Sequence, residues 1–262
     1  MYDIHCHLIY GEDDGSRSIE ESIEMIKIYK SMGYDGSILT PHYDEGRFLV
    51  TSEKTIEKIG LIKEKLNKEN IEFELFTGNE IQIDENTINL IKNNKVLRLN
   101  NSRYILCELP FSTKPLYAKE IFYKMQLEGR IPIIAHPERY SYIKSDIEYF
   151  SNFIKSGCLL QLNLSSLTSN SLSSISKELL ERNMIHFVAT DSHQSKWRNP
   201  NVKDELDILK DLVGDEKFVQ LTATNPKKVI KDQFISSDYD KVIKLSDEVY
   251  KKKKKRWFKF WG

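Results

Sequence analysis

The sequence predicts a single α/β domain of 262 residues in which parallel strands and helices alternate as in a β/α barrel. Seven short apolar segments are each followed by a helical pattern, and successive units start about 25 to 40 residues apart. Repeated strand-then-helix units are typical of a parallel sheet, because each helix returns the chain to the same edge. Metal-competent side chains also follow six of the seven segments, at the rim where barrel active sites lie.

Residues 2–8 are the first predicted strand, because apolar and polar side chains alternate along them. Residues two apart in a strand point to the same face, so two faces are expected. They are Asp3, His5 and His7 on one side, and Ile4, Cys6 and Leu8 on the other. Two imidazoles on one face are half of a metal site, although a His-x-His pair alone is equally compatible with two ordinary histidines.

The other elements follow from strand or helix periodicity between glycine, proline and polar breaks. Strands are predicted at residues 36–40, 72–77, 104–109, 131–135, 158–164 and 185–190. Helices are predicted at residues 18–33, 52–70, 84–93, 115–128, 146–155, 201–212, 226–231 and 238–250, with one more that ends near residue 183. Ser18 is the expected N-cap of the first helix. The serine-rich residues 165–176 are expected to form a surface loop, although such stretches also occur as flexible linkers.

Charge is unevenly distributed along the chain. Residues 251–262 carry seven basic residues and no acidic one, which leaves 32 basic and 39 acidic residues in the body, a net charge of −7. An acidic body argues against nucleic acid as a partner, because the phosphate backbone attracts basic surfaces. No apolar run approaches the roughly 18 residues of a membrane-spanning helix, and cleavage of a leader would remove the candidate ligand His5. We therefore expect a cytoplasmic protein.

The three cysteines, Cys6, Cys107 and Cys158, are far apart and form no Cys-x-x-Cys pair. Their odd number and spacing argue against a disulfide framework and a zinc knuckle. None is followed six residues later by the arginine that a phosphatase with a cysteine nucleophile needs. We expect all three to be small, reduced strand residues.

Nine side chains form a candidate metal site, and all but one lie in or just after a predicted strand. They are His5, His7, Asp14, His42, Glu80, Glu108, His136, Asp191 and His193. Imidazoles and carboxylates without thiolates suit Mn, Fe, Zn or Mg rather than a structural zinc centre. Because one ion needs about four to six ligands, nine candidates predict two or three ions, an arrangement that commonly hydrolyses phosphate esters. The sixth histidine, His186, starts its strand and is expected to be structural.

Six short motifs carry a resemblance to a known family. They are Asp3-Ile-His5-Cys-His7, Asp13-Asp14-Gly15, Thr40-Pro41-His42, Gly78-Asn79-Glu80, His136-Pro137-Glu138-Arg139 and Asp191-Ser-His193. In order and spacing they resemble the PHP (polymerase and histidinol phosphatase) superfamily, and more closely its bacterial capsular and exopolysaccharide tyrosine-protein phosphatases. The resemblance implies a distorted (β/α)7 barrel with a trinuclear site that holds Mn²⁺, with Fe, Zn, Co or Mg as alternatives. It also implies a substrate, phosphotyrosine on a bacterial tyrosine kinase that controls polysaccharide synthesis.

The resemblance further implies roles for individual residues. It assigns one ion to His5, His7, Glu80 and Asp191, a second to Glu80, Glu108 and His136, and a third to Asp14, His42 and His193. Asp13 could serve in place of Asp14, and Asp3 is expected to orient a histidine. Arg139 is expected to bind the phosphate or the transition state, because a planar guanidinium matches phosphate oxygens. Arg198 matches a second basic position in the family, with an ordinary exposed loop arginine as the alternative.

The expected reaction is in-line attack of a metal-activated hydroxide on phosphorus, with no covalent enzyme intermediate. Two other functions stay open. One is another phosphoesterase of the superfamily, such as a histidinol phosphatase or a nuclease, and the acidic body argues against the nuclease. The other is a regulatory module without catalytic activity, which would be expected to have lost some of the ligands.

Residues 251–262 form a basic and aromatic tail after the predicted phosphatase domain of residues 1–250. The tail could attach the protein to an anionic membrane surface, with its aromatic side chains at the level of the headgroups. It could also dock on an acidic patch of a neighbouring subunit in a homo-oligomer, or remain a solvated terminus.

Overall fold

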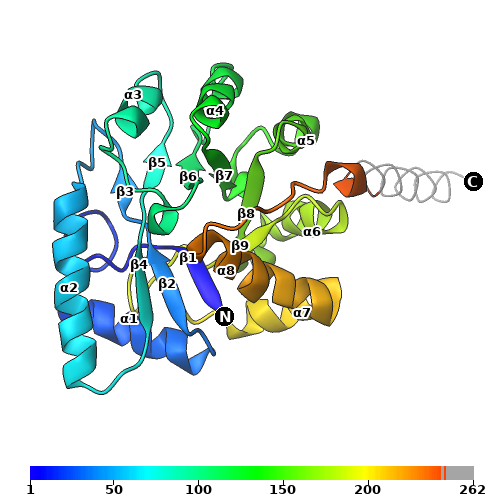
Figure 1. Ribbon diagram of the computed structural model, residues 1–262. Coiled ribbons are helices and arrows are strands. Elements are labelled where there is room, and N and C mark those ends of the chain that lie inside the picture. The colour runs from blue at the N-terminus through cyan, green and yellow to red at the C-terminus, as the bar shows by residue number, and fades with distance from the viewer. Residues whose placement is uncertain (243–244, 246–262) are drawn as a thin grey trace, which may run out of the picture.

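The computed structural model describes residues 1–242 and 245, and within them the strands form two sheets (Figure 1). One sheet has the order β1 (Tyr2–Cys6), β2 (Gly36–Leu39) and β4 (Glu74–Thr77). The other has the order β3 (His42–Tyr43), β5 (Glu80–Gln82), β6 (Tyr104–Glu108), β7 (Ile131–Ala135), β8 (Leu159–Asn163) and β9 (Phe187–Ala189). All neighbouring strands in these sheets run parallel, which confirms the predicted parallel α/β fold.

Two of the predicted strand regions continue from one sheet into the other. β2 is followed after Thr40 and Pro41 by β3, and β4 is followed after Gly78 and Asn79 by β5. Proline has no N–H group for the ladder, so regular pairing is interrupted at Pro41. A Cβ atom at Gly78 would lie 2.9 Å from the Leu99 side chain, so a larger residue would push the chain away at this crossing. The sequence pattern predicted neither β3 nor β5, because each is only two or three residues long.

The end of β1 lies beside the segment that follows β9. Cys6 forms an isolated parallel bridge with Ser192. On one side of this bridge, the Asp191 N–H group donates to the His5 carbonyl at 2.9 Å. On the other side, the His7 N–H group donates to the Ser192 carbonyl at 2.9 Å. Backbone hydrogen bonds therefore fix two segments that carry predicted ligands to each other, although they are far apart in the sequence.

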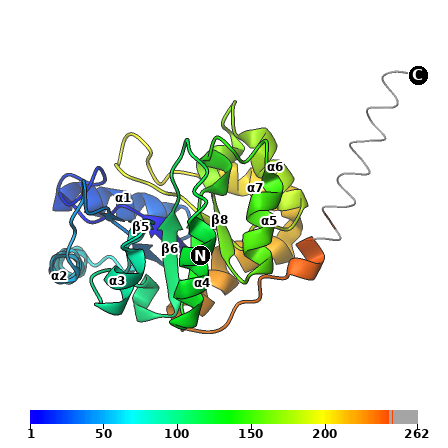
Figure 2. The same ribbon diagram turned by 90° about the horizontal axis from the view of Figure 1, so that it is seen from above.

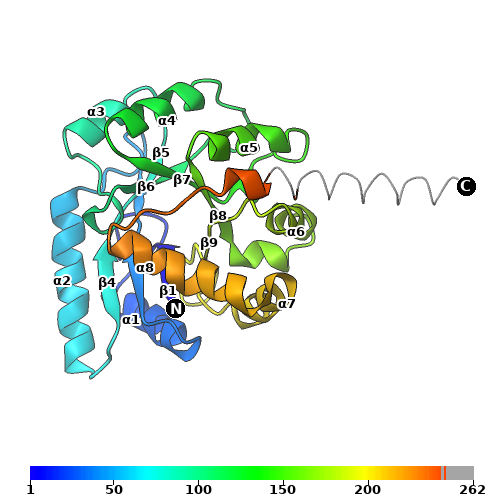
Figure 3. The ribbon, with the colours of Figure 1, turned by 45° about the vertical axis from the view of Figure 1, so that its right-hand side comes forward.

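Helices surround the strands in the described part of the chain (Figure 3). The α-helices are α1 (Ile19–Ser31), α2 (Ser52–Lys68), α3 (Thr87–Lys92), α4 (Ala118–Leu127), α5 (Ile147–Lys155), α6 (Ser173–Glu181), α7 (Lys203–Val219) and α8 (Asn225–Ile230). Shorter turns are the 3₁₀ segments η1 (Leu99–Asn101), η2 (Pro137–Arg139) and η3 (Leu164–Leu167) and the π segment η4 (Gln220–Thr224). Viewed from above, α1 to α3 lie on one side of the strands and α5 to α7 on the other (Figure 2).

The helix boundaries follow local signals in the sequence. The Ser18 side chain caps α1 by accepting the Glu21 N–H group at 3.2 Å, as predicted. α7 extends beyond the predicted end at residue 212, but Gly214 within it has a φ of 76°, which breaks the regular helix. Residues 239–242 and 245 of the predicted helix 238–250 are helical, whereas its remainder and the tail 251–262 lie outside the described residues. None of the described helices has the length and apolar character needed to cross a bilayer.

Neighbouring residues of a strand pack into two separate hydrophobic clusters. In β6, Tyr104 and Leu106 belong to the smaller cluster, whereas Ile105 and Cys107 belong to the larger one. This is the alternation expected when both faces of a strand are buried. The sheets are therefore covered on both faces, and their polar strand ends are the places where a site can form.

β1 departs from this alternation. Ile4 packs in the smaller cluster, whereas Cys6 and Leu8 pack in the larger one, so the predicted common face of these three residues is wrong. The reason is an irregular register between β1 and β2, which shifts between Asp3 and Cys6. Such a shift turns the following side chains to the other face of the strand.

Candidate metal centre

His5 and His7 place their Nε2 atoms 3.3 Å apart at the end of β1. Behind the first ring, His5 Nδ1 donates to Gln161 Oε1 at 2.8 Å. Behind the second ring, His7 Nδ1 donates to Asp13 Oδ2 at 2.7 Å. A hydrogen on Nδ1 leaves the lone pair of Nε2 free to bind a cation. Both rings are fully buried, so these partners determine their orientation.

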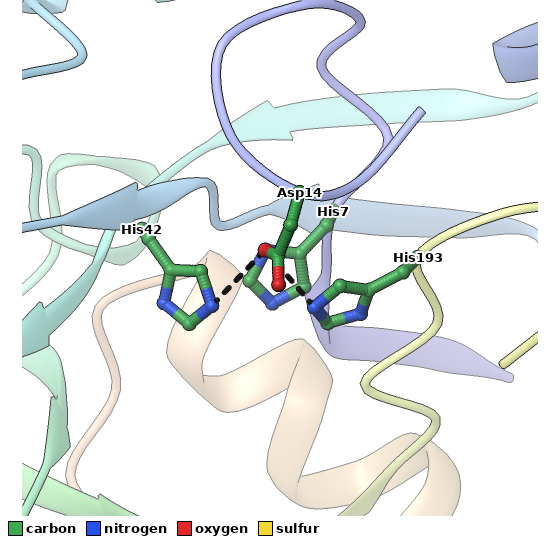
Figure 4. Close-up of side chains that lie close together, drawn as sticks. All are labelled: His7, Asp14, His42 and His193. Carbon is green, nitrogen blue, oxygen red and sulfur yellow. Dashed lines mark ion pairs between the residues drawn. The ribbon is translucent and has the colours of Figure 1, made fainter. Parts of the chain in front are cut away.

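Asp14 lies between His42 and His193, with its Oδ1 atom 3.5 Å from Nε2 of each ring (Figure 4). The ligand atoms of these three residues and of His7 all lie within 4.8 Å of one another. Asp13 instead binds the rear nitrogen of His7 and accepts the backbone N–H group of His42 at 3.0 Å. The geometry therefore favours Asp14 as the ligand, and its side chain, 46% exposed, leaves the cluster open to solvent.

Burial and hydrogen bonding favour the neutral form of His193. Burial lowers the pKa of its imidazole to about 4. Its Nδ1 atom donates to the Asp191 carbonyl at 3.0 Å, and its Nε2 atom accepts from Arg198 Nη1 at 3.0 Å. The lone pair of a neutral Nε2 atom can bind a cation in place of the Arg198 hydrogen bond.

Glu80 lies at the centre of the cluster. Its Oε2 atom is 3.2 Å from His5 Nε2, 3.5 Å from His7 Nε2 and 3.0 Å from His42 Nδ1. Its Oε1 atom is 2.9 Å from His136 Nε2. Burial alone would raise the pKa of Glu80, but the surrounding imidazoles hold that pKa well below its ordinary value. A carboxylate in this position can therefore bridge two cations.

Glu108 and His136 meet at the side of the cluster formed by β6 and β7. His136 Nε2 lies 3.3 Å from Glu108 Oε1 and also contacts Glu80. Burial lowers the pKa of His136, but hydrogen bonds to Glu108 and Glu80 outweigh it and raise the pKa to about 10. Two carboxylates at one imidazole thus attract positive charge, which a proton or a metal ion can supply.

Asp191 connects the histidines to two arginines. Its Oδ1 atom lies 3.4 Å from His5 Nε2 and 3.3 Å from His7 Nε2. Its Oδ2 atom accepts from Arg139 Nη1 at 2.9 Å and from Arg198 Nη2 at 2.6 Å. Burial raises the pKa of this carboxyl, but the neighbouring imidazoles and Arg198 keep it well below its ordinary value.

Left-handed backbone occurs at three of the predicted site residues. The φ angles of His136, Asp191 and Arg198 are 32°, 49° and 49°. This conformation is unfavourable for residues with a Cβ atom and is often found at functional sites. It occurs at His136 directly after β7 and at Asp191 two residues after β9, where the chain must turn into the site.

Cations fit this arrangement of donors. The buried Oε2 atom of Glu80 makes no hydrogen bond with any described residue, although imidazole nitrogens surround it. Three sets of ligand atoms each lie within 4.8 Å: His7, Asp14, His42 and His193; His5, His7 and Glu80; and His42, Glu80 and Glu108. His136 and Asp191 fall outside these sets but contact their members. Imidazole and carboxylate donors of this kind suit divalent first-row metals.

Several residues that contact the centre were not among the predicted site residues. Gln161 and Asn163 lie in β8, and Asn163 donates to Asp191 Oδ2 at 2.7 Å. Glu138, which is fully buried, accepts the Asn163 N–H group at 3.1 Å and the Ser166 hydroxyl group at 2.8 Å. The spacing of Gln161 and Asn163, two apart at a strand end, was the signal that could have identified this pair.

Asp3 contacts His5 through the backbone only. Its Oδ1 atom accepts the His5 N–H group at 3.1 Å, whereas Gln161 binds the imidazole ring. The Asp3 Oδ2 atom accepts the Tyr29 hydroxyl group at 2.7 Å and the Thr190 hydroxyl group at 2.6 Å. Asp3 therefore joins α1 to the ends of β1 and β9 and does not orient a histidine ring as expected.

A cavity of about 140 Å³ opens above the cluster. Arg139 and Arg198 line it, as do the candidate ligands Glu80, Glu108 and His136. Two phenylalanines from surrounding loops complete its wall together with polar side chains. Polar groups at the base of a cavity beside two guanidinium groups are suited to an anionic substrate.

Comparisons of sequence and of structure identify the same group of relatives. The tyrosine-protein phosphatase YwqE of Bacillus subtilis (strain 168) is 34% identical over 238 residues, which cover 90% of this chain and 93% of the relative. CapC of Staphylococcus aureus is 33% identical over 267 aligned positions, which cover 98% of this chain and 99% of the relative.

A solved structure is similar along nearly the whole chain. It is one of the crystal structures of YwqE from Bacillus subtilis and CpsB from Streptococcus pneumoniae, which are described as unique metal-dependent tyrosine phosphatases. Its TM-score is 0.86 at 34% identity, and the match covers 90% of this chain and 96% of that one. The family described as capsular polysaccharide synthesis, CpsB/CapC, matches residues 1–231. This chain is therefore a member of the CpsB/CapC family of capsular polysaccharide synthesis proteins.

Proposed function

We propose that this chain is a metal-dependent protein-tyrosine phosphatase that acts on a bacterial tyrosine kinase in capsular or exopolysaccharide synthesis. The names of its relatives support the activity. The observation that carries the proposal is the convergence of imidazoles and carboxylates on Glu80, beside two arginines that share Asp191. The phosphotyrosine-bearing tail of the kinase is the proposed partner, and nucleic acid is not.

The proposed cofactor is Mn²⁺, in two or three ions, with Fe, Zn, Co or Mg as alternatives. The nine ligands are those predicted from the sequence, and the three sets of ligand atoms within 4.8 Å support this number of ions. When bound, divalent ions would lower the pKa of water towards neutrality and balance the negative charge on the phosphate. Proteins contribute to such sites by fixing the ligands, and here Gln161 and Asp13 hold the histidine rings from behind.

Arg139 and Arg198 are proposed to bind the phosphate oxygens. Among the described residues, Arg139 donates only through Nη1 to Asp191, so its other N–H groups are available. Arg198 also contacts His193 and the Asp191 carbonyl. Fixed guanidinium groups beside the ligands would stabilise charge that develops on the oxygens during in-line attack. The departing phenolate has an ordinary pKa of about 10 and leaves more readily than an alkoxide.

Direct hydrolysis without a covalent intermediate is supported by the state of the cysteines. Cys6, Cys107 and Cys158 are free and buried, as predicted. Burial raises the pKa of all three thiols. A protonated, buried thiol cannot act as the nucleophile of a phosphatase.

We also infer the finer features that the sequence implies. The two sheets form a distorted (β/α)7 barrel, which the bridge between Cys6 and Ser192 supports. The protein works in the cytoplasm, and the tail of residues 251–262 attaches it to the inner face of the membrane or to a neighbouring subunit.

The decisive experiment measures hydrolysis of a phosphotyrosyl peptide, of histidinol phosphate and of DNA by the full chain. A chelator should abolish peptide hydrolysis, and titrated Mn²⁺ should restore it. His136→Ala should remain inactive at every Mn²⁺ concentration, whereas the matched control His186→Gln, outside the cluster, should retain activity. Activity that resists the chelator, or a preference for histidinol phosphate or DNA, would contradict the proposal.

A further inference from the structure

Two phenylalanines lie on the histidines at opposite sides of Glu80. The Phe48 ring is stacked on His42, with centroids 5.6 Å apart and an interplanar angle of 14°. The Phe111 ring is stacked on His136, with centroids 5.5 Å apart and an angle of 17°. His42 contacts Glu80 Oε2 and His136 contacts Glu80 Oε1, so the two rings lie one imidazole away from the centre of the cluster.

Both rings are held by ordered backbone. Phe48 and Asp44 exchange two backbone hydrogen bonds, of 2.8 and 2.9 Å, which close the short loop after β3. The Phe111 carbonyl accepts the Ser141 N–H group at 2.9 Å, which ties the loop after β6 to the loop after β7. The rings are therefore pre-positioned at the cavity, a condition that lowers the entropic cost of binding.

The two phenylalanines lie outside the hydrophobic core of the described residues. Neither belongs to the two hydrophobic clusters, and Phe111 is 38% exposed. Both line the cavity, where charged and polar side chains are the majority. The guanidinium carbon of Arg47 lies over the Phe48 ring, 4.7 Å from its centroid, and that of Arg139 lies over the Phe111 ring, 4.9 Å from its centroid, at cation–π distance. Apolar surface kept beside water is unfavourable, and a ligand that covers it recovers that free energy.

We propose that Phe48 and Phe111 are specificity-determining residues that form an apolar mouth for the aryl ring of the substrate. This inference rests on the proposed phosphatase function. In an aryl phosphate a single oxygen joins the ring to phosphorus, so a phosphate at the ligands places the ring at the level of the two phenyl groups. Contacts between aromatic rings, edge-to-face or offset, favour this position.

The same mouth disfavours phosphoserine. A phosphoserine side chain is short, so its phosphate reaches the ligands only if the peptide backbone enters the cavity. Backbone N–H and C=O groups between two phenyl rings would lose hydrogen bonds to water without gaining partners. Tyrosine keeps the backbone outside, because its ring spans the mouth. The aromatic residues thus select by what they exclude as well as by what they contact.

The test compares two inhibitors that share the anionic group but differ in the aryl ring. Binding of inorganic phosphate and of phenylphosphonate to the Mn²⁺-loaded full chain is measured by calorimetry. The dissociation constant for phosphate divided by that for phenylphosphonate is the ratio that reports the contribution of the ring, independently of turnover. Phe48→Ala and Phe111→Ala should each reduce this ratio, and the double variant should reduce it on the order of tenfold. Phosphate binding should change little.

Two further variants control the result. Leu49→Ala removes a neighbouring apolar side chain that is 60% exposed and does not line the cavity, so it should leave the ratio unchanged. Phe48→Leu and Phe111→Leu keep an apolar wall without an aromatic ring and should lie between the wild type and the alanine variants. Metal content is measured for each variant, because His42 and His136 lie beneath the rings.

The outcomes separate this inference from the proposed function. An unchanged ratio in the double alanine variant, or an equal loss of affinity for phosphate and phenylphosphonate, overturns the aryl mouth. The inference is supported if the ratio falls in the double alanine variant and if kcat/KM for phosphotyrosyl peptide, divided by kcat/KM for phosphoseryl peptide, is lower than in the wild type. If the wild type does not hydrolyse phosphotyrosyl peptide, the proposed function fails, whereas the binding ratio still reports on the mouth.

Discussion

Asp191 shows how one side chain serves both halves of the site. Its Oδ1 atom faces the Nε2 atoms of His5 and His7, and its Oδ2 atom accepts from both Arg139 and Arg198. A guanidinium group is planar and holds its donors in fixed directions, so its pairing with a carboxylate fixes its orientation as well as its charge. The arginines are therefore oriented by the same residue that contacts the candidate metal ligands.

Arg139→Lys keeps the positive charge but removes the planar fork. We expect kcat/KM for a phosphotyrosyl peptide to fall by about 10- to 100-fold, the loss of one good charge-assisted contact in the transition state. Metal content should remain unchanged, because Arg139 is not a ligand. Arg182→Lys, which alters the arginine that follows α6 and pairs with Glu178, is the matched control and should retain wild-type kinetics. A variant with wild-type kcat/KM would exclude a role for the fork.

His186 illustrates a histidine with a structural role. Its Nδ1 atom accepts the Leu160 N–H group at 3.1 Å, and its Nε2 atom donates to the Ser237 carbonyl at 3.0 Å. Both nitrogens are thus satisfied in the neutral ring. Burial lowers the pKa to about 4, which means that protonation is disfavoured in the folded state.

A depressed histidine pKa makes stability depend on pH. Between about pH 6.5 and pH 4 the unfolded chain takes up a proton at residue 186 that the folded chain does not, so stability falls as pH decreases. The contribution of His186 to this loss is about 3 kcal/mol. Urea unfolding at pH 7 and pH 4.5 should therefore give a smaller difference for His186→Gln than for wild type. Equal differences would contradict the neutral buried state.

At the scale of elements, α1 is joined to the site by polar contacts. The Tyr29 hydroxyl group contacts Asp3 Oδ2 at 2.7 Å, Ser192 Oγ at 2.7 Å and the Thr190 hydroxyl group. Tyr29 is fully buried in the larger cluster, so this network connects a packed helix to the ends of β1 and β9. A buried network in which every member has partners makes a unique arrangement more stable.

Tyr29→Phe removes the hydroxyl group and keeps the ring. The buried Asp3 carboxylate would lose a donor, and we expect a loss of about 1 to 3 kcal/mol in the free energy of unfolding. Tyr34→Phe is the matched control, because the described residues contain no hydrogen bond to the Tyr34 hydroxyl group, although its ring also packs against Tyr29. Denaturant unfolding of both variants checks this, and equal stability of the two would contradict the role of the network.

At the scale of the whole molecule, the candidate ligands come from parts of the chain that are far apart in the sequence. They come from the ends of β1, β3, β5, β6, β7 and β9 and from the loop before α1. Buried carboxylates and imidazoles without cations retain unbalanced charge. Ions that bind only the folded state increase the free energy of unfolding.

Metal removal should therefore lower the thermal midpoint of the full chain. At Mn²⁺ concentrations 100-fold above the dissociation constant, each bound ion increases the free energy of unfolding by about 2.7 kcal/mol. Glu80→Gln should abolish most of the Mn²⁺-dependent shift, because Glu80 takes part in two of the three ligand sets. Glu148→Gln changes an exposed residue of α5 and should leave the shift intact. Differential scanning calorimetry of the full chain with chelator and with Mn²⁺ measures the two midpoints. Equal midpoints would contradict the coupling between metal binding and stability.

The tail of residues 251–262 leads to a prediction that comes from sequence alone, since it lies outside the described residues. Six consecutive basic residues followed by four aromatic ones among the last six favour an anionic bilayer. The full chain should sediment with anionic vesicles, and a chain ended at residue 250 should not. Phosphatase activity on a soluble peptide should be the same for both. Equal sedimentation of the two chains would remove the membrane role.

The sequence by itself determined the order and type of the longer elements, although not the short strands β3 and β5. Seven predicted strands correspond to β1, β2, β4 and β6 to β9, and Ser18 begins α1 as expected. These features depend on spacing within a short segment, which periodicity and capping residues report directly. The candidate ligands were also predictable, because parallel strands bring their carboxyl ends to one rim.

Only the tertiary structure decided how these side chains face one another. It distinguishes Asp14 from Asp13, shifts the register of β1, and divides two strand regions between the sheets. It also brings Phe48 and Phe111 to the cavity, which no motif marked. Each of these outcomes depends on contacts between segments far apart in the chain, and local spacing carries no information about the direction from which a distant partner approaches.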